Sequence, residues 1–537
     1  MSSRPGVGKF EERERLARLS WEWIALRIRL LSRVVRRHAV IAIALGIYVG
    51  LVGYQAFHHE LWRDEVRALN IAAGSRTPLD LVHNLRNEGH PILWYLLLYA
   101  GYHLTGSMLV LKPLALLIAA GAMVLWLRFS PFPVWQRLLL LFGQLPLYEY
   151  SVMCRNYGIS MLLMFALAAL YPQRFRQPLR MGVLLALLAN TNAHSLVLSG
   201  AWLVALVLEG LLHRPPERAP LWRLGIGLLL AVSGMAFSAW VLKPDETTLV
   251  NNVASHDWIT VQGALLTALG SPVSIHGRFL GLGFDTLLTV LFWLLVLSFL
   301  RRPWLAASLV VAALGIALFP LLIYALDLRH GGLFLIFVVS LLWIDAAASR
   351  APGWPRPLER LWDILAQQRA AAFSLFLLGQ VCLAVPLVRL DLTNTLSGAA
   401  SLGRFLRSDP ALRHAIVLGD PEPALEALPY YTSSQVFLNR EDRFLIKVSL
   451  TTANRQELSL AELLQTGERL KAETGRPVVF ALGHQLGSEG PFERWTGFGK
   501  VFRYDEASLD RFLERTTALG YFGAMLGDES FQVFRLR

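Results

Sequence analysis

The most regular feature of the chain is a series of long apolar blocks separated by short polar segments that carry arginine. A bilayer core of about 30 Å requires about 20 mostly apolar residues in a helix, and most of the blocks approach that length. The first block covers residues 39–57 and the last covers 371–388. This pattern predicts a polytopic α-helical membrane protein. The expected spans between the two are 134–149, 157–171, 181–193, 196–213, 224–242, 285–300, 304–325 and 331–348.

Residues 91–127 do not fit this scheme as one simple helix. They hold two apolar stretches that are divided at residues 105–107. If residues 58–90 lie outside and Arg128 lies inside, the whole segment must make one net crossing. We therefore expect a half-helix or a re-entrant piece here, since broken helices at membrane depth are tolerated where protein surrounds them.

Basic residues indicate the orientation of the spans. The first 37 residues contain ten lysines and arginines, and cytoplasmic loops are enriched in both. We therefore expect the N-terminal segment 1–38 in the cytoplasm, followed by an uncleaved first span and about 11 net crossings in all. The other loops expected inside are 128–137, 174–180, 214–223, 301–302 and 350–369, and the segments expected outside are 58–90, 149–157, 190–195, 243–283, 326–330 and the chain from 389 onward.

The chain changes character after residue 388. Apolar runs shorten and charges rise, so residues 39–388 are expected to form the membrane domain and residues 389–537 an extracytoplasmic soluble α/β domain. Ser459 and Glu462 form a capping box at the start of one helix, and Gly475 fits its end. This domain has no phosphate loop, triad or metal set in its sequence, so we expect it to brace the membrane domain or present an acceptor. The expected strands are 414–418, 434–438, 477–482, 500–504 and 531–536.

Composition and charge support this division. Hydrophobic residues make up 54% of the chain and charged residues 17%, against about 25% charged in soluble domains. The net charge is +12, but residues 390–537 hold 17 basic and 19 acidic residues, so the excess lies in the membrane half. Such placement indicates topology and contact with anionic lipids, and we find no nucleic-acid motif. The cysteines, Cys154 and Cys382, have no metal-ligand spacing.

The first outer segment carries the strongest candidate chemistry. Asp64 and Glu65 directly follow the first span, where a carboxylate can act as a general base. Adjacent helical residues point about 100° apart, so the two are expected to have different tasks, one at a substrate hydroxyl and one at a neighbouring cation or metal. The alternative is a solvated helix start. Gly74 divides the segment into two short helices, which return Glu88 and His90 to the surface near Asp64; for His90 the alternative is a capped helix end.

Other outer segments carry polar residues at membrane depth. Glu149 and Arg155 are expected to line a wet cavity or to pair with each other, because a lone charge inside a bilayer is costly. His194 interrupts an apolar hairpin. Arg329 and His330 lie between two apolar spans. The planar guanidinium of Arg329 suits a phosphate. The alternative is that the side chain extends to the membrane boundary so that its charge reaches water.

The loop 243–283 contains Lys243 and His256 and ends in a glycine-rich stretch, so one interpretation is a lid. Together, five outer segments supply carboxylates, histidines or arginines to one side of the membrane. They describe a cavity that faces outward. Its content suits an anionic, lipid-attached substrate, with cations for a phosphate, a carboxylate base and membrane walls for an acyl or prenyl tail.

Two of these motifs resemble the GT-C superfamily of polyprenyl-phosphate-sugar-dependent glycosyltransferases. The similarity is to the branch of protein O-mannosyltransferases and aminoarabinose transferases, or glycosyltransferase family 39. WRDE at residues 62–65 matches the superfamily's Asp-Glu motif in the first outer loop, and EGHP at 88–91 is similar to its acidic, then His-Pro, entry to the next helix. Residues 149–157 resemble the next outer motif loosely, and the similarity covers about residues 39–348.

The resemblance implies a GT-C-like fold and an inverting transfer of a sugar from a polyprenyl-phosphate donor to an acceptor hydroxyl on a glycan, lipid or protein. It implies that Asp64 is the general base, assisted by Glu65, and that Glu88 and His90 shape the pocket. We expect no cofactor and no metal, because the adjacent pair lacks the separated acids of metal-using oligosaccharyltransferases. Electrostatics assigns the donor phosphate to Arg329, Arg155 and His330, and the remaining substrate-binding candidates are Glu149, His194 and His256.

Two other classes of function fit the same charges. One is a transporter or flippase for a lipid-linked or anionic solute, whose charges would mark a translocation path. The other is a non-catalytic subunit of an envelope-polymer assembly machine. The pattern of the first outer segment is not repeated in the second half of the chain, and the polar residues gather on one side of the membrane and not at its centre. Both observations favour an enzyme over a transporter. The expected location is the bacterial inner membrane, with the N-terminus cytoplasmic and the C-terminal domain periplasmic.

Overall fold

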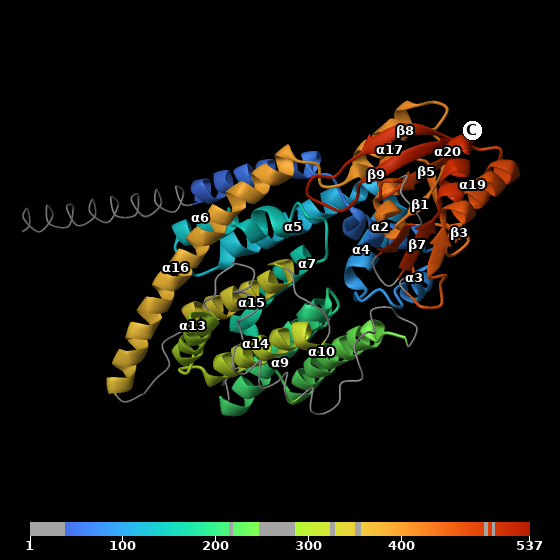
Figure 1. Cartoon of the computed structure of the whole chain (residues 1–537). Helices are drawn as coiled ribbons and strands as arrows, with labels where there is room; N and C mark the ends of the chain where they lie inside the picture. Colours follow the sequence, from blue (N-terminus) through green and yellow to red (C-terminus); the bar gives the residue numbers. More distant parts are fainter. Residues whose placement is uncertain are drawn as a thin grey trace, which may run out of the picture.

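The structure is a computed structural model that describes residues 38–213, 218–245, 262, 285–322, 328–348, 356–449, 451–487, 492–496 and 500–537. The basic segment 1–37 and most of the loop 243–283, including His256, lie outside these residues. The described chain forms a bundle of helices with two β-sheets at one end (Figure 1).

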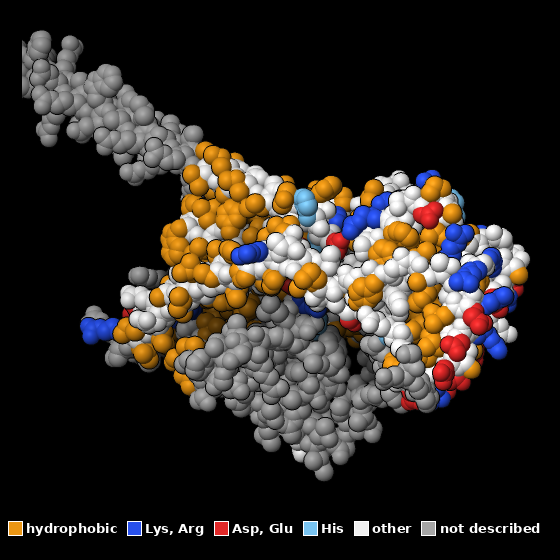
Figure 2. All heavy atoms as spheres, turned by 45° about the horizontal axis from the view of Figure 1, so that its top comes forward, with side chains coloured by type: hydrophobic (Ala, Val, Ile, Leu, Met, Phe, Trp, Pro, Cys, Tyr) orange, Lys and Arg blue, Asp and Glu red, His pale blue; other side chains and the backbone are white. Residues whose placement is uncertain are grey.

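Six helices of the described chain are long and apolar enough to cross a membrane. They are His38–His58, Met108–Phe129, Ala193–Leu212, Leu221–Leu242, Arg329–Ala347 and Glu359–Ser408, and shorter apolar helices cover Tyr157–Gln173, Pro178–Ala189 and Pro303–Phe319. On the face shown in Figure 2, apolar side chains predominate on the visible part of the bundle, whereas charged side chains gather on the C-terminal domain. These features are those of a membrane protein, and the number of eleven crossings stays a prediction.

The helices follow the expected spans, with clear departures at the last span, where α16 (Arg356–Thr393) begins well before the expected residue 371 and covers most of the expected loop 350–369, and at residues 134–149. Here α6 (Val134–Leu141) is only eight residues long, which gives a rise of about 12 Å, and a π-helical turn, η2 (Leu145–Glu149), completes the segment. Gly143 and Pro146 interrupt the α-helix, because glycine weakens it and proline lacks the backbone donor. The other helices of the bundle are α4 (Leu93–Thr105), η1 (Met108–Val110), α5 (Leu111–Phe129), α7 (Tyr157–Leu170), η3 (Tyr171–Gln173), α8 (Pro178–Ala189), α9 (Ala193–Leu212), α10 (Leu221–Leu242), α13 (Asp285–Ser298), α14 (Pro303–Leu322), α15 (Leu328–Ala347) and α16 (Arg356–Thr393).

The break predicted within residues 91–127 is confirmed. α4 ends at Thr105, and Gly106 has a φ of +65°, a left-handed conformation that favours glycine. The chain then resumes as η1 and α5. At the other end of α4, the Leu93 amide donates to the Asn190 carbonyl at 2.9 Å, which ties the start of this helix to the turn between α8 and α9.

The first loop, which we define as residues 58–90, contains two short helices, as expected. α2 (Arg63–Gly74) ends at Gly74, and α3 (Pro78–Asn84) starts behind a capping box in which Thr77 and Asp80 exchange hydrogen bonds. α2 packs against both α4 and η5 (Glu422–Ala427) of the C-terminal domain. The loop therefore lies between the bundle and the C-terminal domain.

The C-terminal domain is an α/β structure, as expected. Its six-stranded sheet has the order β3-β2-β1-β5-β9-β8, in which β1 is parallel to β2 and β5, and a three-stranded sheet has the order β4-β7-β6. All five predicted strands are present; β3, β4, β6 and β8 were not predicted. The elements are α17 (Gly398–Ser408), β1 (Ile416–Asp420), α18 (Leu428–Tyr431), β2 (Gln435–Leu438), β3 (Arg443–Phe444), β4 (Glu457–Ser459), α19 (Leu460–Thr474), β5 (Val478–Leu482), β6 (Phe492–Thr496), β7 (Lys500–Tyr504), α20 (Glu506–Arg515), β8 (Thr516–Phe522) and β9 (Phe531–Leu536).

The two faces of the large sheet belong to different cores. Val417 and Val479 join a core that continues into the bundle, whereas Leu418 and Phe480 face a separate core with α19 and α20. The boundary expected at residue 389 falls inside α16, because this helix continues to Thr393. The capping box of Ser459 and Glu462 at the start of α19 is confirmed. One face of the sheet thus holds the domain against the bundle.

Candidate functional site

The first turn of α2 places two neighbouring carboxylates in opposite surroundings. The Trp62 amide at its start donates to Glu65 at 3.2 Å, and carboxylates are stabilised at this end of a helix. The side chain of Asp64 is 35% exposed, whereas that of Glu65 is fully buried. The two side chains therefore point to different surroundings, and their expected different tasks stay a prediction.

Glu65 belongs to a group that we call the His59 network, made of the buried side chains of His59, Glu65 and Asp391 and the half-buried Tyr148. His59 Nε2 lies 3.1 Å from Glu65 Oε2, and His59 Nδ1 lies 2.8 Å from Asp391 Oδ1. Tyr148 donates to the same Asp391 oxygen at 3.0 Å. Burial lowers the pKa of His59, but the two carboxylates outweigh burial and raise this pKa to about 10. The network therefore holds a protonated imidazole between two carboxylates.

Glu65 also fixes the segment that carries Arg155. Its Oε1 atom accepts a hydrogen bond from the Cys154 amide at 2.7 Å. The next residue, Arg155, donates from Nη1 to Asp64 Oδ2 at 2.9 Å. The buried carboxylate thus positions the partner of the partly exposed one.

The Asp64–Arg155 pair forms the open side of the site. Arg63 Nε lies 3.9 Å from Asp64 Oδ1. Burial raises the pKa of Asp64, but the positive charges of Arg155, Arg63 and Arg329 outweigh it, so this pKa lies below its usual value. Asp64 is therefore ionised at neutral pH and is held by cations. An incoming phosphate would compete for those guanidinium groups, because their planar forks match its oxygens.

Aromatic and imidazole rings line the region next to this pair. The Tyr157 hydroxyl lies 2.9 Å from His330 Nε2, and the Arg155 guanidinium lies 5.5 Å from the centre of the Tyr157 ring. The rings of His194 and His330 stack with their centres 4.6 Å apart. Two predicted histidines, from α9 and α15, thus meet beside the predicted arginine.

Arg329 approaches the same region from α15. Its guanidinium lies 5.7 Å from the centre of the Trp62 ring, and its carbonyl accepts a hydrogen bond from the Tyr150 hydroxyl at 2.7 Å. Gly332 allows this contact, since a Cβ there would lie 2.4 Å from the same hydroxyl. Glu149 is half-buried at the end of η2, directly before Tyr150. The segments expected at 149–157 and 326–330 therefore meet at the first loop.

Glu88 belongs to a second cluster of ion pairs. Its carboxylate pairs with Arg67, which also donates to Glu426 at 2.6 Å and to the Val448 carbonyl at 2.9 Å. Lys447 Nζ lies 3.9 Å from Glu88. The cluster joins the first loop to the C-terminal domain. Glu88 therefore helps to hold these two parts of the protein together.

His90 is half-buried near the Asp64–Arg155 pair. Burial and the charge of Arg155 lower the pKa of His90 to about 4, although the Glu88 and Asp64 carboxylates oppose this change. At neutral pH its imidazole is uncharged and can donate from one ring nitrogen and accept at the other.

Several residues of this arrangement were not predicted from the sequence. They are His59, Tyr148, Tyr157, Asp391 and Glu426. One of them carried a usable signal: Asp391 is an acidic residue beside a strongly apolar run, and such residues are rarely without a partner. The others gain their role from contacts between segments far apart in the chain.

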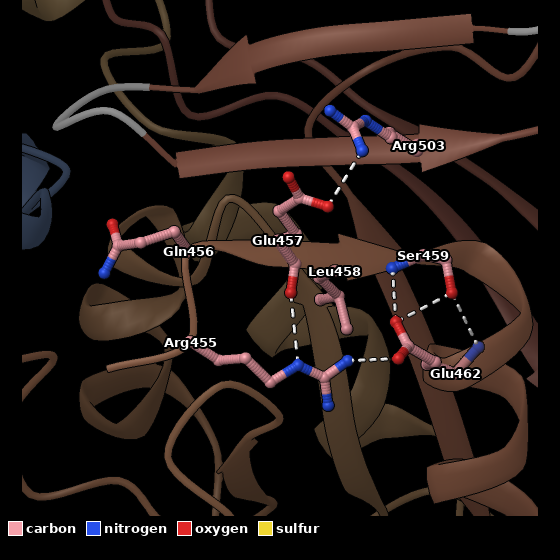
Figure 3. Close-up of a pocket in the computed structure, with 7 residues that line it drawn as sticks. All are labelled: Arg455, Gln456, Glu457, Leu458, Ser459, Glu462 and Arg503. Atoms are coloured by element: carbon pink, nitrogen blue, oxygen red, sulfur yellow. Dashed lines mark hydrogen bonds and ion pairs between the residues drawn. The ribbon is translucent and has the colours of Figure 1, made fainter. Parts of the chain in front are cut away.

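A surface pocket of about 390 Å³ lies elsewhere, in the C-terminal domain (Figure 3). It is lined mainly by charged side chains on and just before β4, at the start of α19 and on β7. Arg503 pairs with Glu457 at 2.8 Å, Arg455 pairs with Glu462, and Ser459 caps the helix, so the cations and helix donors are already engaged. We therefore place the candidate site at Asp64 and not at this pocket.

Among the described residues, no group of three or more His, Cys, Asp or Glu side chains could hold a metal ion. No protein-family model, curated protein or solved structure matches the chain.

Proposed function

We propose that the protein is a membrane glycosyltransferase. It would move a sugar from a polyprenyl-phosphate donor to a hydroxyl of a glycan, lipid or protein acceptor, on the periplasmic face of a bacterial inner membrane. The observation that carries this proposal is the partly exposed Asp64 carboxylate paired with Arg155 directly after the first apolar helix. The pair supplies a base and a phosphate-binding cation, and the surrounding helices supply an apolar surface for a prenyl chain.

The proposed reaction is an inverting displacement. The acceptor oxygen attacks C1 of the sugar while the bond from C1 to the phosphate oxygen breaks. The hydroxyl proton passes to Asp64, and the bonding electrons leave with the polyprenyl phosphate. Arg155 and Arg329 stabilise the charge that grows on the phosphate.

The pairing of Asp64 with Arg155 also suggests an order of events. While Arg155 holds Asp64, the carboxylate is a weak base, because its pKa is lowered. A donor phosphate competes for Arg155, and a carboxylate that loses its cationic partner becomes more basic. Asp64 therefore becomes an effective base when the donor is bound.

Glu65 and Glu88 have positioning roles in this proposal. Glu65 accepts hydrogen bonds from Cys154 and Trp62 and contacts His59, and Glu88 pairs with Arg67. Both carboxylates are buried, so neither is available to a substrate. His90, His194 and His330 would shape the pocket beside the reacting groups.

The test compares wild type with Asp64→Asn in lipid nanodiscs, using mass spectrometry to follow the consumption of polyprenyl-phosphate monosaccharides when membrane extract supplies acceptors. Loss of a positioned base typically lowers the rate about 10²- to 10⁴-fold, so the variant should be nearly inactive. Asp80→Asn is the matched control, because Asp80 lies in the same loop and caps α3. If no donor is consumed by wild type but donor still binds, the transporter or the assembly-subunit hypothesis is favoured instead.

A further inference from the structure

The turn between β8 and β9 presents apolar side chains outward from the C-terminal domain. We call residues 523–529 the β8–β9 turn. The side chain of Met525 is 72% exposed and that of Leu526 is 45% exposed. Tyr521 is exposed on the adjoining strand. Neighbouring apolar side chains that face outward mark a contact surface more often than scattered single ones do.

This turn is held firmly by contacts on both sides. The amides of Met525 and Leu526 donate to the Thr395 carbonyl at 2.8 and 3.1 Å. Gly527 packs so closely that a Cβ there would lie 2.3 Å from the Leu396 carbonyl. On the other side, Arg63 donates to both oxygens of Asp528 at 2.6 and 2.9 Å. The outward direction of the apolar side chains is therefore built into the fold.

The contacts place the turn where two apolar helices end. Thr395 follows the end of α16 by two residues, and Arg63 follows the first helix, His38–His58, by five. In Figure 1 the turn extends from the sheet back toward the ends of these two helices. The last turns of both helices expose residues that favour a membrane boundary: Phe57 is 82% exposed, and Arg389 is also exposed.

We propose that the β8–β9 turn is a membrane anchor, in which Met525 and Leu526 enter the interfacial region of the lipid leaflet on that side. The partner is the lipid surface, because the turn lies beside helices whose own exposed side chains are apolar. Interfacial segments of this kind bury their apolar side chains about 5–10 Å into the boundary between headgroups and acyl chains. The anchor holds the C-terminal domain against the bilayer whatever reaction the protein performs.

Depth-dependent fluorescence quenching tests this anchor. The exposed Cys382 is replaced by serine, the buried Cys154 is kept, and Met525→Cys is labelled with bimane in the full-length protein. The protein is reconstituted in phosphatidylcholine nanodiscs that contain lipids with a nitroxide near the headgroup. Leu513→Cys is the control, because Leu513 is an apolar side chain as exposed as Leu526, at 45%, but lies on α20.

The anchor predicts that the nitroxide lipids quench the label at residue 525 at least about twofold more than the label at 513, and that aqueous iodide shows the opposite preference. Equal lipid quenching at both positions overturns the proposal. Protection of residue 525 from both quenchers also overturns it, since that result indicates a protein partner. A circular dichroism spectrum and a thermal midpoint equal to those of the unlabelled protein establish that each variant is folded.

Discussion

Asp64 and Glu65 are chemically similar and adjacent, yet the fold uses them in different ways. On the closed side, Glu65 shares His59 with Asp391, and none of these three side chains is more than 2% exposed. On the open side, Asp64 keeps a third of its surface exposed and contacts one guanidinium at 2.9 Å. Burial and the number of partners, more than residue type, separate a structural carboxylate from one that can meet a substrate.

The largest expected effect on thermal stability comes from removing the imidazole at the centre of the His59 network. His59→Leu leaves the Glu65 and Asp391 carboxylates buried without the cation between them. Removal of one member of a buried ion pair typically costs about 3–5 kcal/mol, so the thermal midpoint should fall sharply. Tyr148→Phe is the matched control, because it removes one hydrogen bond to Asp391 and costs about 1 kcal/mol. Similar midpoints for the two variants would show that the imidazole carries no charge.

A pH series sharpens the same comparison. The pKa of His59 is about 10 in the folded protein and 6.5 in its ordinary state, so between these values the folded protein keeps a proton that the unfolded chain has lost. The stabilisation from His59 is therefore complete below about pH 6.5 and is lost as the pH rises toward about 10.

The measurement is the difference in thermal midpoint between wild type and His59→Gln across this pH range. The difference should be largest at the acidic end and should shrink as the medium becomes alkaline. Using a difference removes the contributions of Glu529 and Lys447, whose pKa values are also shifted. A difference that grows with pH would contradict the protonated state of His59.

A third test changes the open side while keeping its charge. Arg155→Lys retains a cation beside Asp64 but loses the planar fork that fits a phosphate. Under the proposed function, we expect donor consumption to fall about 10- to 100-fold, which corresponds to about 1.4–2.7 kcal/mol, while the thermal midpoint changes little. Arg174→Lys is the control, because Arg174 forms a comparable pair with Glu209 elsewhere in the bundle. Equal losses of activity in the two variants would remove Arg155 from the site.

The sequence predicted best what depends on local patterns. The apolar blocks located the helices, the split near Gly106 located a broken helix, and Ser459 with Glu462 located the start of α19. These signals lie within a few residues of each other. The strand β8 was not predicted because it lies at the edge of the sheet and most of its side chains are exposed, so it lacks a buried alternation.

The sequence could not predict which charges pair. His59 contacts Asp391 across 332 residues, and Asp64 contacts Arg155 across 91. The motif at residues 62–65 led us to assign both of its carboxylates to the reaction, and that assignment stays a prediction. Only the packing of the first loop between the bundle and the C-terminal domain shows that Glu65 is enclosed.

The smallest expected effect concerns the ion pair between Arg63 and Asp528, which links the open side to the C-terminal domain. Asp528 is 69% exposed, and solvent screens such pairs, so Asp528→Asn should cost less than about 1 kcal/mol. The corresponding loss in the buried cluster, Arg67→Met, leaves Glu88 and Glu426 buried without their shared cation and should cost several times more. Thermal midpoints of the two variants measure this ratio. A larger loss for Asp528→Asn would show that the β8–β9 turn, and not the Arg67 cluster, holds the domain in place over Asp64.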